Sequence, residues 1–405
     1  MGNRLCILVV VGTRPEAIKM APVVRALEGD GRFVPILCAT GQHRTLLADA
    51  LAAFGLAPDV DLELMEVDQQ PAALAAAVLT GIDEVIRHQR PAWVLVQGDT
   101  VTTLAAAQAA FYARTPLAHV EAGLRSGDRG HPFPEEGNRC MVASIADLHF
   151  APTPAARDNL LAAGVNRRSI HVTGNTAIDA LLMMAEAVRM DQRLTREMTK
   201  AIPTLAPGRA RGRRVVLVTA HRRESLGEGI TRICAAVARL TEREDIEIVW
   251  PVHPNPHVHA AVRRLLGGHR RIHLIAPLDY RRFVWLLRRV DLVLTDSGGL
   301  QEEAPALGKP VLVMRAVTER PEALAAGATR LVGTDPTRIL SAVARLLDDP
   351  AAYAAMAKPR FPFGDGHAAE RIVQVLAKEK AKTVGWSSTP TSRLDPALPN
   401  AQPGR

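Results

Sequence analysis

The sequence predicts an α/β protein of two domains, each built on a parallel β-sheet. Short apolar runs of strand length alternate with helical patterns along most of the chain, an order typical of parallel sheets covered by helices. With 405 residues, 47% of them hydrophobic, the chain exceeds the usual size of one domain and can bury two cores. A charged helical stretch and a loop rich in Pro, Gly and Arg interrupt the alternation near the middle of the chain. We place the domain boundary there.

Apolar runs predict the strands in chain order. In the first half these runs are residues 5–11, 33–39, 93–99, 117–123, 146–152 and 169–175. In the second half they are residues 214–220, 246–253, 271–277, 291–296, 309–315 and 329–335. Ligands of parallel α/β sheets bind beyond the carboxyl ends of the strands. Two such sheets facing each other across a cleft would therefore surround one site with the loops that follow their strands.

We expect the first domain to span residues 1–176 and the second domain residues 177–365, followed by a helix over residues 366–382. The second domain begins with the charged helical stretch, and the Arg-rich loop follows it. Residues 383–405 are rich in Pro, Ser and Thr and have no periodicity, so we predict a disordered tail.

Composition and charge argue against several classes of protein. The formal charge of +8 comes mostly from the Arg-rich loop and the tail, so we expect no nucleic-acid groove, although small anionic ligands fit. No apolar run reaches the ~18 residues that span a bilayer, and the first run lacks a signal-type cleavage site, so we expect a cytoplasmic protein. The four cysteines are far apart, without a C-x-x-C pair, and are expected to be buried thiols.

The stretch "VVVGTRPEAIKMAPVVRAL" (residues 9–27) predicts a strand, a glycine turn and a helix. Arg14 and Lys19 stand near the start of that helix, where free N–H groups and the helix dipole favour anions. Pro15 suits a first helical turn. The stretch lacks G-x-G-x-x-G, so it does not indicate a dinucleotide site. The alternative is an ordinary turn with solvated basic residues.

A similar design occurs in "LTDSGGLQEEAPALGKPVLVMR" (residues 294–315). Ser297, Gly298 and Gly299 would let the backbone approach a phosphate, while the spacing differs from that of a P-loop. Glu302 and Glu303 follow in the first helical turn, where carboxylates can simply complement the dipole. A nucleotide would give Glu303 a sharper purpose, because a carboxylate can accept hydrogen bonds from a ribose diol.

Acidic residues in the first half form a second candidate group. Asp99 and Glu121 directly follow apolar strands, and Glu135 and Glu136 lie in "HPFPEEGNR". Each could instead be a helix cap or an ion-pair partner of a nearby arginine. Several carboxylates converging on one cleft favour proton-transfer chemistry.

The histidines offer a ligand for phosphate rather than a metal site. His221, in "TAHRRE", follows the first strand of the second half and can hydrogen-bond a leaving phosphate. In "VHPNPHVH" the two prolines prevent a helix that would align His253 with His257, so zinc is not expected. We expect His257 and His259 to be polar loop residues.

These segments together resemble the non-hydrolysing bacterial type of the UDP-N-acetylglucosamine 2-epimerase family. The resemblance covers roughly residues 5 to 375 and includes the motifs already quoted, along with "GQH", "QGDT", "HVEAGLRSGD", "VTGNTAID", "TERPEAL" and "GDGHAAERI". It implies a GT-B-type fold of two Rossmann-like domains, a final helix that returns to the first domain, a homodimer, and interconversion of UDP-GlcNAc with UDP-ManNAc without NAD or another cofactor. UDP-ManNAc would supply cell-surface polysaccharide.

The resemblance also implies roles for single residues. Asp99, Glu121 and Glu135 match the family's catalytic acidic positions, and His221 matches its catalytic histidine. Another group would hold UDP: Arg14, Lys19, Ser297, Gly298 and Gly299 at the diphosphate, and Glu303 at the ribose. The reaction would eliminate UDP to give 2-acetamidoglucal and then add it back after protonation on the opposite face.

Some members of the family also bind a second UDP-GlcNAc as an activator. Gln42, Glu135, Arg222 and His253 fit that pattern, whereas Thr45 and Asp68 depart from it. An acidic residue in place of an arginine repels a diphosphate. Other functions stay open at this point: a hydrolysing epimerase, an epimerase of 2,3-diacetamido uronic acid nucleotides, a GT-B glycosyltransferase, and a nucleotide-sugar sensor.

Overall fold

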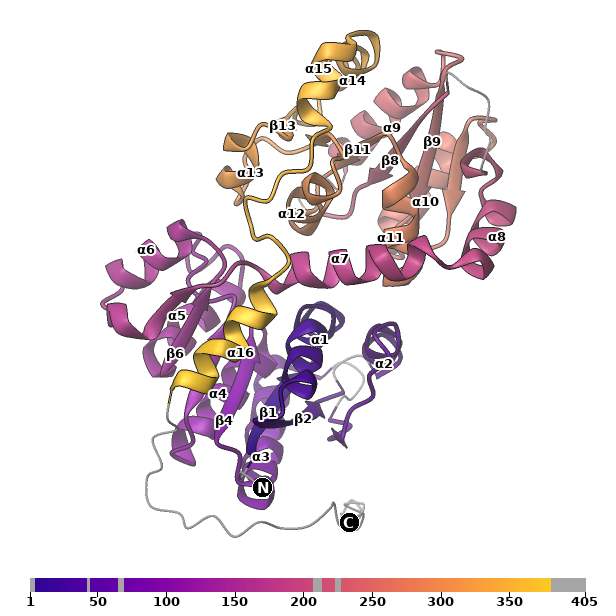
Figure 1. Cartoon of the computed structure of the whole chain (residues 1–405). Helices are drawn as coiled ribbons and strands as arrows, with labels where there is room; N and C mark the ends of the chain where they lie inside the picture. Colours follow the sequence, from indigo (N-terminus) through magenta and orange to yellow (C-terminus); the bar gives the residue numbers. More distant parts are fainter. Residues whose placement is uncertain (1–3, 42–43, 65–68, 207–212, 223–226, 380–405) are drawn as a thin grey trace.

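The computed structural model describes residues 4–41, 44–64, 69–206, 213–222 and 227–379 (Figure 1). It contains a seven-stranded sheet in the order β3-β2-β1-β4-β5-β6-β7 and a six-stranded sheet in the order β10-β9-β8-β11-β12-β13. Strands pair in parallel throughout both sheets, as the register of β1 with β2 and of β8 with β9 illustrates. The predicted fold class of two parallel-sheet α/β domains is therefore confirmed.

The strands lie where the apolar runs predict them: β1 and β2 match their runs, and the other predicted strands end one to four residues earlier than their runs. In the first sheet they are β1 (Leu5–Val11), β2 (Phe33–Ala39), β3 (Val60–Asp61), β4 (Trp93–Gln97), β5 (Leu117–Val120), β6 (Leu148–Ala151) and β7 (Ile170–Val172). In the second they are β8 (Arg214–Thr219), β9 (Ile246–Pro251), β10 (Ile272–Ile275), β11 (Leu292–Thr295), β12 (Val311–Val313) and β13 (Thr329–Leu331). The edge strand β3 escapes prediction because it has only two residues and no apolar run.

Helices cover the sheets and follow the strands in alternation. They are α1 (Arg14–Gly29), α2 (Arg44–Ala52), α3 (Pro71–Gln89), α4 (Val101–Tyr112), α5 (Glu135–Ile145), α6 (Pro154–Ala162), α7 (Thr176–Arg189), α8 (Gln192–Ala201), α9 (Glu228–Leu240), α10 (Pro256–Leu266), α11 (Tyr280–Arg289), α12 (Gly298–Ala306), α13 (Pro321–Ala325), α14 (Pro336–Asp348), α15 (Pro350–Met356) and α16 (Ala368–Lys378). His257 and His259 lie in the first turn of α10, so their predicted loop position is wrong. Pro256 suits the start of this helix, because the first helical position needs no N–H donor and proline has none.

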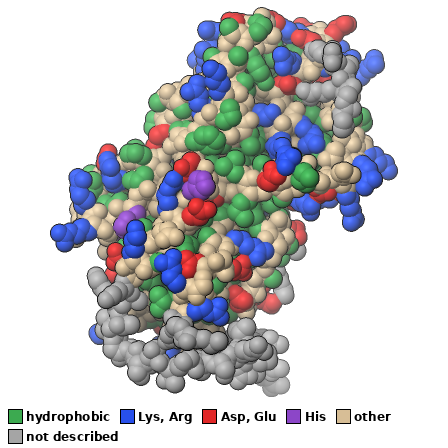
Figure 2. Space-filling model, viewed as in Figure 1, with side chains coloured by type: hydrophobic (Ala, Val, Ile, Leu, Met, Phe, Trp, Pro, Cys, Tyr) green, Lys and Arg blue, Asp and Glu red, His purple; other side chains and the backbone are tan. Residues whose placement is uncertain are grey.

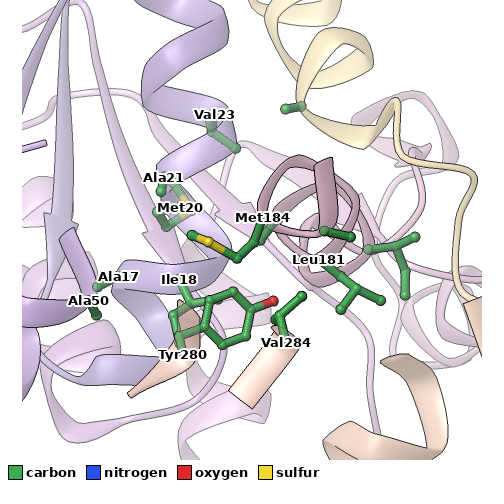
Figure 3. Close-up of a cluster of buried hydrophobic side chains, with 14 of the residues drawn as sticks. Ala17, Ile18, Met20, Ala21, Val23, Ala50, Leu181, Met184, Tyr280 and Val284 are labelled. Carbon is green, nitrogen blue, oxygen red and sulfur yellow. The ribbon is translucent and has the colours of Figure 1, made fainter. Parts of the chain in front are cut away.

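An apolar cluster joins the two domains (Figure 3). Ile18 and Met20 of α1, Met184 of α7, and Tyr280 and Val284 of α11 are all buried in it. Helix α7 lies across the domain boundary in Figure 1 and packs against both α1 and α11. This packing sets how the loops of one domain face those of the other.

The chain returns to the first domain at its end, where α16 packs against α1 and α7. Its N-terminus has no capping side chain of its own, but the Asp179 carboxylate of α7 accepts a hydrogen bond from Ala369 N–H at 2.8 Å. The two chain crossings between the domains touch at glycines. A Cβ on Gly174 would lie 3.1 Å from Gly364 Cα, and both glycines have positive φ.

We expect Asp179→Ala to lower the free energy of unfolding by about 1–2 kcal/mol, because it removes this cap from a buried helix end. Asp179→Asn is the matched control, since its amide oxygen still accepts the hydrogen bond in the same volume. Urea denaturation of both variants measures the difference. Equal stability of Asp179→Ala and wild type would show that Asp179 does not hold α16.

The surface mixes charges of both signs. On the face that Figure 2 shows, both basic and acidic side chains are scattered over the two domains. Among the described residues, no helix is long and apolar enough to cross a membrane. All four cysteines carry free thiols; Cys38 and Cys234 are buried as predicted, whereas Cys6 and Cys140 are only half-buried.

Candidate active site

The carboxyl ends of neighbouring strands bring the predicted residues together. In the first sheet, β4 lies between β1 and β5, so the loops carrying Arg14, Asp99 and Glu121 are adjacent. In the second sheet β8 pairs with β11, which brings the loop of His221 beside the turn of Ser297. Parallel sheets concentrate loops in this way, and ligands bind there.

Lys19 and Glu121 form the centre of the first-domain side. The Lys19 ammonium lies 2.5 Å from Glu121 Oε2, and Gln97 Nε2 donates to the same oxygen at 2.8 Å. Burial alone would raise the pKa of Glu121, but Lys19, Arg320 and Arg139 bring it below its usual range. Burial would likewise lower the pKa of Lys19, yet Glu121 and its other acidic neighbours raise it. The pair is therefore fully charged at neutral pH.

The backbone of Glu121 adopts a conformation that few non-glycine residues use. Its φ is 63°, in the left-handed region, and Gly123 two residues later has a φ of 89°. A Cβ on Gly123 would approach the carbonyl oxygen of Ala156 to 2.2 Å, so only glycine fits at this position. Backbone strain of this kind costs about 1–3 kcal/mol and concentrates at functional sites. In this turn, the Glu121 carboxylate contacts Lys19 of α1.

Asp99 forms an ion pair with Arg139 of α5. Arg139 Nε lies 2.7 Å from Asp99 Oδ2, and Asn138 Nδ2 donates to the Asp99 carbonyl at 2.8 Å. The arginine partner that the sequence offers as an alternative reading is therefore present. Burial raises the pKa of Asp99, Arg139 opposes this effect, and Glu121 adds to it, leaving the pKa above its usual value. Asp99 and Glu121 thus have pKa values displaced in opposite directions.

The adjacent glutamates of α5 have separate environments. Glu136 is buried and accepts hydrogen bonds from Arg139 at 2.8 Å and from the backbone N–H of Ser126 at 3.0 Å. Glu136 therefore holds the loop that precedes α5. In contrast, Glu135 Oε2 is buried without a hydrogen-bond partner among the described residues. An unpartnered buried acceptor is costly, and a ligand can satisfy it.

On the second-domain side, His221 is held by Asp296 and His253. His221 Nδ1 lies 3.2 Å from Asp296 Oδ1, and its ring stacks on His253 with centroids 5.5 Å apart. Asp296 also accepts the backbone N–H groups of His221 and Arg222, both at 2.9 Å. Burial lowers the pKa of His221 despite the nearby carboxylate. A neutral imidazole bonded through Nδ1 presents Nε2 to a ligand.

The turn after β11 has the features of an anion site. Helix α12 starts at Gly298, and the side chain of its N-cap residue, Ser297, makes no capping hydrogen bond. The guanidinium of Arg222 lies against the turn, because a Cβ on Gly298 would be 3.2 Å from Arg222 Nη2. Free N–H groups, a hydroxyl and a guanidinium at a helix N-terminus together favour a phosphate.

Glu302 and Glu303 also differ from each other. Glu302 is buried, accepts from Asn175 Nδ2 at 2.8 Å and forms an ion pair with Arg320, so it links the second domain to the end of the first. Burial, together with the carboxylate of Glu302, raises the pKa of Glu303 to about 7.

Arg14 connects the first domain to the second, because its Nη2 donates to the Leu278 carbonyl at 3.3 Å.

Part of the predicted second site cannot be placed. Gln42 and Asp68 lie outside the described residues, as does the side chain of Thr45 in α2. Arg222, His253 and Glu135 of the same set lie beside the candidate active site.

Several residues of the site escape the sequence analysis. Thr13 and Glu16 form a capping box at the start of α1, a T-x-x-E signal readable from the sequence. Asp296 directly follows an apolar strand, as Asp99 does. Arg320 and Gln97 carry no local signal, because only the tertiary fold brings them to Glu302 and Glu121.

The two parallel-sheet domains have a GT-B-type architecture. One carries a lysine–carboxylate cluster and the other a helix N-terminus suited to a phosphate. A family model described as UDP-N-acetylglucosamine 2-epimerase matches residues 25–377. The chain belongs to this family.

Curated relatives and solved structures match this chain over more than nine-tenths of its length. The UDP-N-acetylglucosamine 2-epimerase of Escherichia coli K12 is 48% identical over 375 residues, which cover 92% of this chain and 99% of that protein. The UDP-GlcNAc 2-epimerase of Neisseria meningitidis, solved with UDP-GlcNAc bound, superposes with a TM-score of 0.86 at 40% identity and covers 93% of this chain and 100% of that one. The Methanocaldococcus jannaschii enzyme, solved with UDP-GlcNAc and UDP, gives a TM-score of 0.78 at 32% identity, with the same coverage.

Proposed function

We propose that the protein interconverts UDP-GlcNAc and UDP-ManNAc by inverting C2 without net hydrolysis. The observation that carries this proposal is the cluster of Asp99, Glu121 and Lys19 at the edge of one sheet, opposite the anion turn of the other. Proton transfer and diphosphate binding are thereby available on two sides of one substrate. The names of the relatives support the choice of UDP-GlcNAc.

The chemistry explains why both groups are needed. C2 of the sugar carries an acetamido group and has no neighbouring carbonyl, so its proton is poorly acidic. In the proposed elimination, the C1–O bond breaks and its electron pair leaves with UDP, while a carboxylate removes the C2 proton and a C1=C2 double bond forms. Protonation of C2 from the opposite face and re-addition of UDP at C1 then give the epimer. No oxidant or cofactor enters this balance.

Opposite pKa displacements suggest how the carboxylates divide the work. Glu121 is ionised beside Lys19 and suits a base, whereas the raised pKa of Asp99 suits a group that carries a proton. Glu135, with its unpartnered oxygen, is the third proposed catalytic carboxylate. His221 would act on the departing diphosphate: once protonated, with Nδ1–H held by Asp296, it would donate from Nε2–H.

We assign the diphosphate to Arg14, Lys19, Ser297 and the Gly298–Gly299 turn, and the ribose to Glu303. Lys19 would serve twice, because the same ammonium that pairs with Glu121 can also meet the negative charge that develops on the leaving group. Holding the released UDP matters as much as breaking the bond, because re-addition needs it in place. Closure of the two domains would keep water from the intermediate.

The raised pKa of Glu303 gives a pH-dependent prediction. A ribose diol donates hydrogen bonds and so prefers the ionised carboxylate, which dominates only above about pH 7. We therefore expect UDP affinity to rise between pH 6 and pH 8 more steeply in wild type than in Glu303→Gln. Isothermal titration calorimetry measures UDP affinity for both proteins. Comparing the two pH profiles removes the effect of ionisation of UDP itself, because it is the same for both. Parallel pH profiles would contradict a role for Glu303 at the ribose.

The direct test of the proposed function is the product of UDP-GlcNAc incubated with the purified protein and EDTA, without NAD or acceptor. Anion-exchange chromatography should show UDP-ManNAc at a constant total of UDP-sugar. Free ManNAc with equal UDP would identify a hydrolysing enzyme. No change would redirect the assignment to 2,3-diacetamido uronic acid nucleotides or to a transferase. We also propose a cytoplasmic location, and the proposed supply of cell-surface polysaccharide depends on the first outcome.

We also propose a homodimer, which the family resemblance implies. The end of α4 exposes Phe111 and Tyr112, at 55% and 67% of their surface, and Met141 of the neighbouring α5 is 47% exposed. A second copy of the chain would cover this apolar face.

Light scattering after gel filtration should show a dimer that Phe111→Glu/Tyr112→Glu converts to a monomer. Val317→Glu, at an exposed apolar residue of the second domain, should leave the dimer intact; a dimer in all three proteins would exclude this face.

A second UDP-GlcNAc at Gln42, Glu135, Arg222 and His253 is part of the proposal. The stacking of His253 on His221 would place the activator beside the reacting sugar. Such activation predicts a lag when the reaction starts from UDP-ManNAc alone, and that a trace of UDP-GlcNAc removes the lag. Linear progress from the first turnover would argue against it.

A further inference from the structure

Glu16 connects two loops of the candidate active site without belonging to the carboxylate cluster. It is the third residue of α1 and is only 2% exposed. Its Oε2 accepts the backbone N–H groups of Gly12 at 3.0 Å and Thr13 at 2.6 Å. Its Oε1 accepts the hydroxyls of Thr100 at 2.7 Å and Thr103 at 3.0 Å. Both oxygens of one buried carboxylate are thus used, Oε2 by the loop before α1 and Oε1 by the N-cap and first turn of α4.

Each of these loops presents a residue of the proposed chemistry. Gly12 and Thr13 directly precede Arg14, and Thr100 directly follows Asp99. The first loop also touches the start of α4, since a Cβ on Gly12 would lie 2.2 Å from Thr102 Oγ1. No side chain can therefore separate them. The carboxylate of Glu16 bonds to both segments and so fixes their position relative to each other.

The same helix continues to the next element of the cluster. Lys19 follows Glu16 by three residues, about one helical turn, and holds Glu121 at 2.5 Å. The first two turns of α1 thereby hold the loop of Asp99 through Glu16 and the side chain of Glu121 through Lys19. A shift of Glu16 would move these carboxylates relative to each other.

We propose that Glu16 is a positioning residue that keeps Asp99 and Arg14 in register, a role that rests on the proposed function. Glu16 acts through hydrogen-bond geometry, because its two oxygens span the gap between the loops. A misplacement of about 1 Å at a reacting group can cost about 100-fold in rate. The length of this side chain therefore matters more than its charge.

Two substitutions separate length from charge. Glu16→Gln keeps the length, since its oxygen can still accept the two N–H groups and its NH2 can donate to the two hydroxyls. Glu16→Asp keeps the charge and the helix cap but is one methylene too short to reach Thr100 and Thr103. Asp335→Ala is the control for loss of a helix cap far from the site, because Asp335 caps α14 through Arg338 N–H at 2.8 Å.

The experiment measures kcat and KM for UDP-GlcNAc, UDP affinity and the crystal structures of these variants. We expect kcat of Glu16→Gln within about fivefold of wild type, and kcat of Glu16→Asp lower by about 10- to 100-fold with Asp99 displaced. Asp335→Ala should lose thermal stability but keep kcat. Activity of Glu16→Asp equal to or above that of Glu16→Gln would overturn the proposal and indicate a role for the charge. If wild type fails to epimerise UDP-GlcNAc, the proposed function falls, and the position of Asp99 in crystals of Glu16→Asp alone decides the role of Glu16.

Discussion

Asp99→Asn is expected to lower kcat for epimerisation by about 10²- to 10⁴-fold, the usual contribution of a general acid or base. The amide keeps an oxygen for Arg139, so the fold and the neighbouring ion pair with Glu136 should persist. It cannot exchange a proton at neutral pH, which removes the role that the raised pKa of Asp99 indicates. UDP affinity should stay within about threefold of wild type, because the diphosphate contacts lie elsewhere.

The control for this variant is Asp83→Asn, which changes a partly exposed carboxylate paired with Arg87 on α3. Steady-state kinetics and UDP titration of both variants compare the two sites. A kcat for Asp99→Asn similar to that of Asp83→Asn would show that Asp99 serves only its ion pair with Arg139.

Lys19→Met should abolish activity and also lower the free energy of unfolding at neutral pH by about 3–5 kcal/mol. The substitution leaves the Glu121 carboxylate, with a side chain only 6% exposed, without its main cation. In wild type the lowered pKa of Glu121 contributes stability above its usual pKa, and this contribution is lost as the pH falls. In Lys19→Met burial should instead raise that pKa, so that stability falls as the pH rises.

The double variant Lys19→Met/Glu121→Gln tests this reasoning, because it removes the buried charge along with its partner. It should recover most of the lost stability in urea denaturation without recovering activity. The exposed pair Arg87 and Asp83 is a matched comparison, since Arg87→Met should cost less than about 1 kcal/mol. If Lys19→Met were as stable as wild type, the charges of the central pair would not be coupled as described.

The strands could be predicted because apolar runs report burial directly. β1 and β2 coincide with their runs, Leu5–Val11 and Phe33–Ala39. The apolar runs of β4 and β5 extend two and three residues beyond the strands, since Asp99 and Glu121 belong to the loops that follow. Composition alone could not separate a strand from the functional loop that continues it.

The residue types of the site were predictable, whereas their pairings were not. A carboxylate after a strand is visible in the sequence, but the contacts of Lys19 with Glu121 and of Glu302 with Arg320 depend on how distant segments pack. The sequence predicts Lys19 as a phosphate ligand at a helix start, and only the fold shows that it also pairs with a carboxylate. Glu135 and Glu136 read alike, although one is unpartnered and the other holds a loop.

The central claim is that the C2 proton leaves and returns while UDP stays bound. Proton NMR of the wild-type protein with UDP-GlcNAc in D2O, without NAD, metal or acceptor, tests it most directly. The account predicts that UDP-ManNAc appears and that deuterium replaces the C2 proton in both epimers. UDP-ManNAc that retained its original C2 proton, or free ManNAc released with stoichiometric UDP, would contradict it.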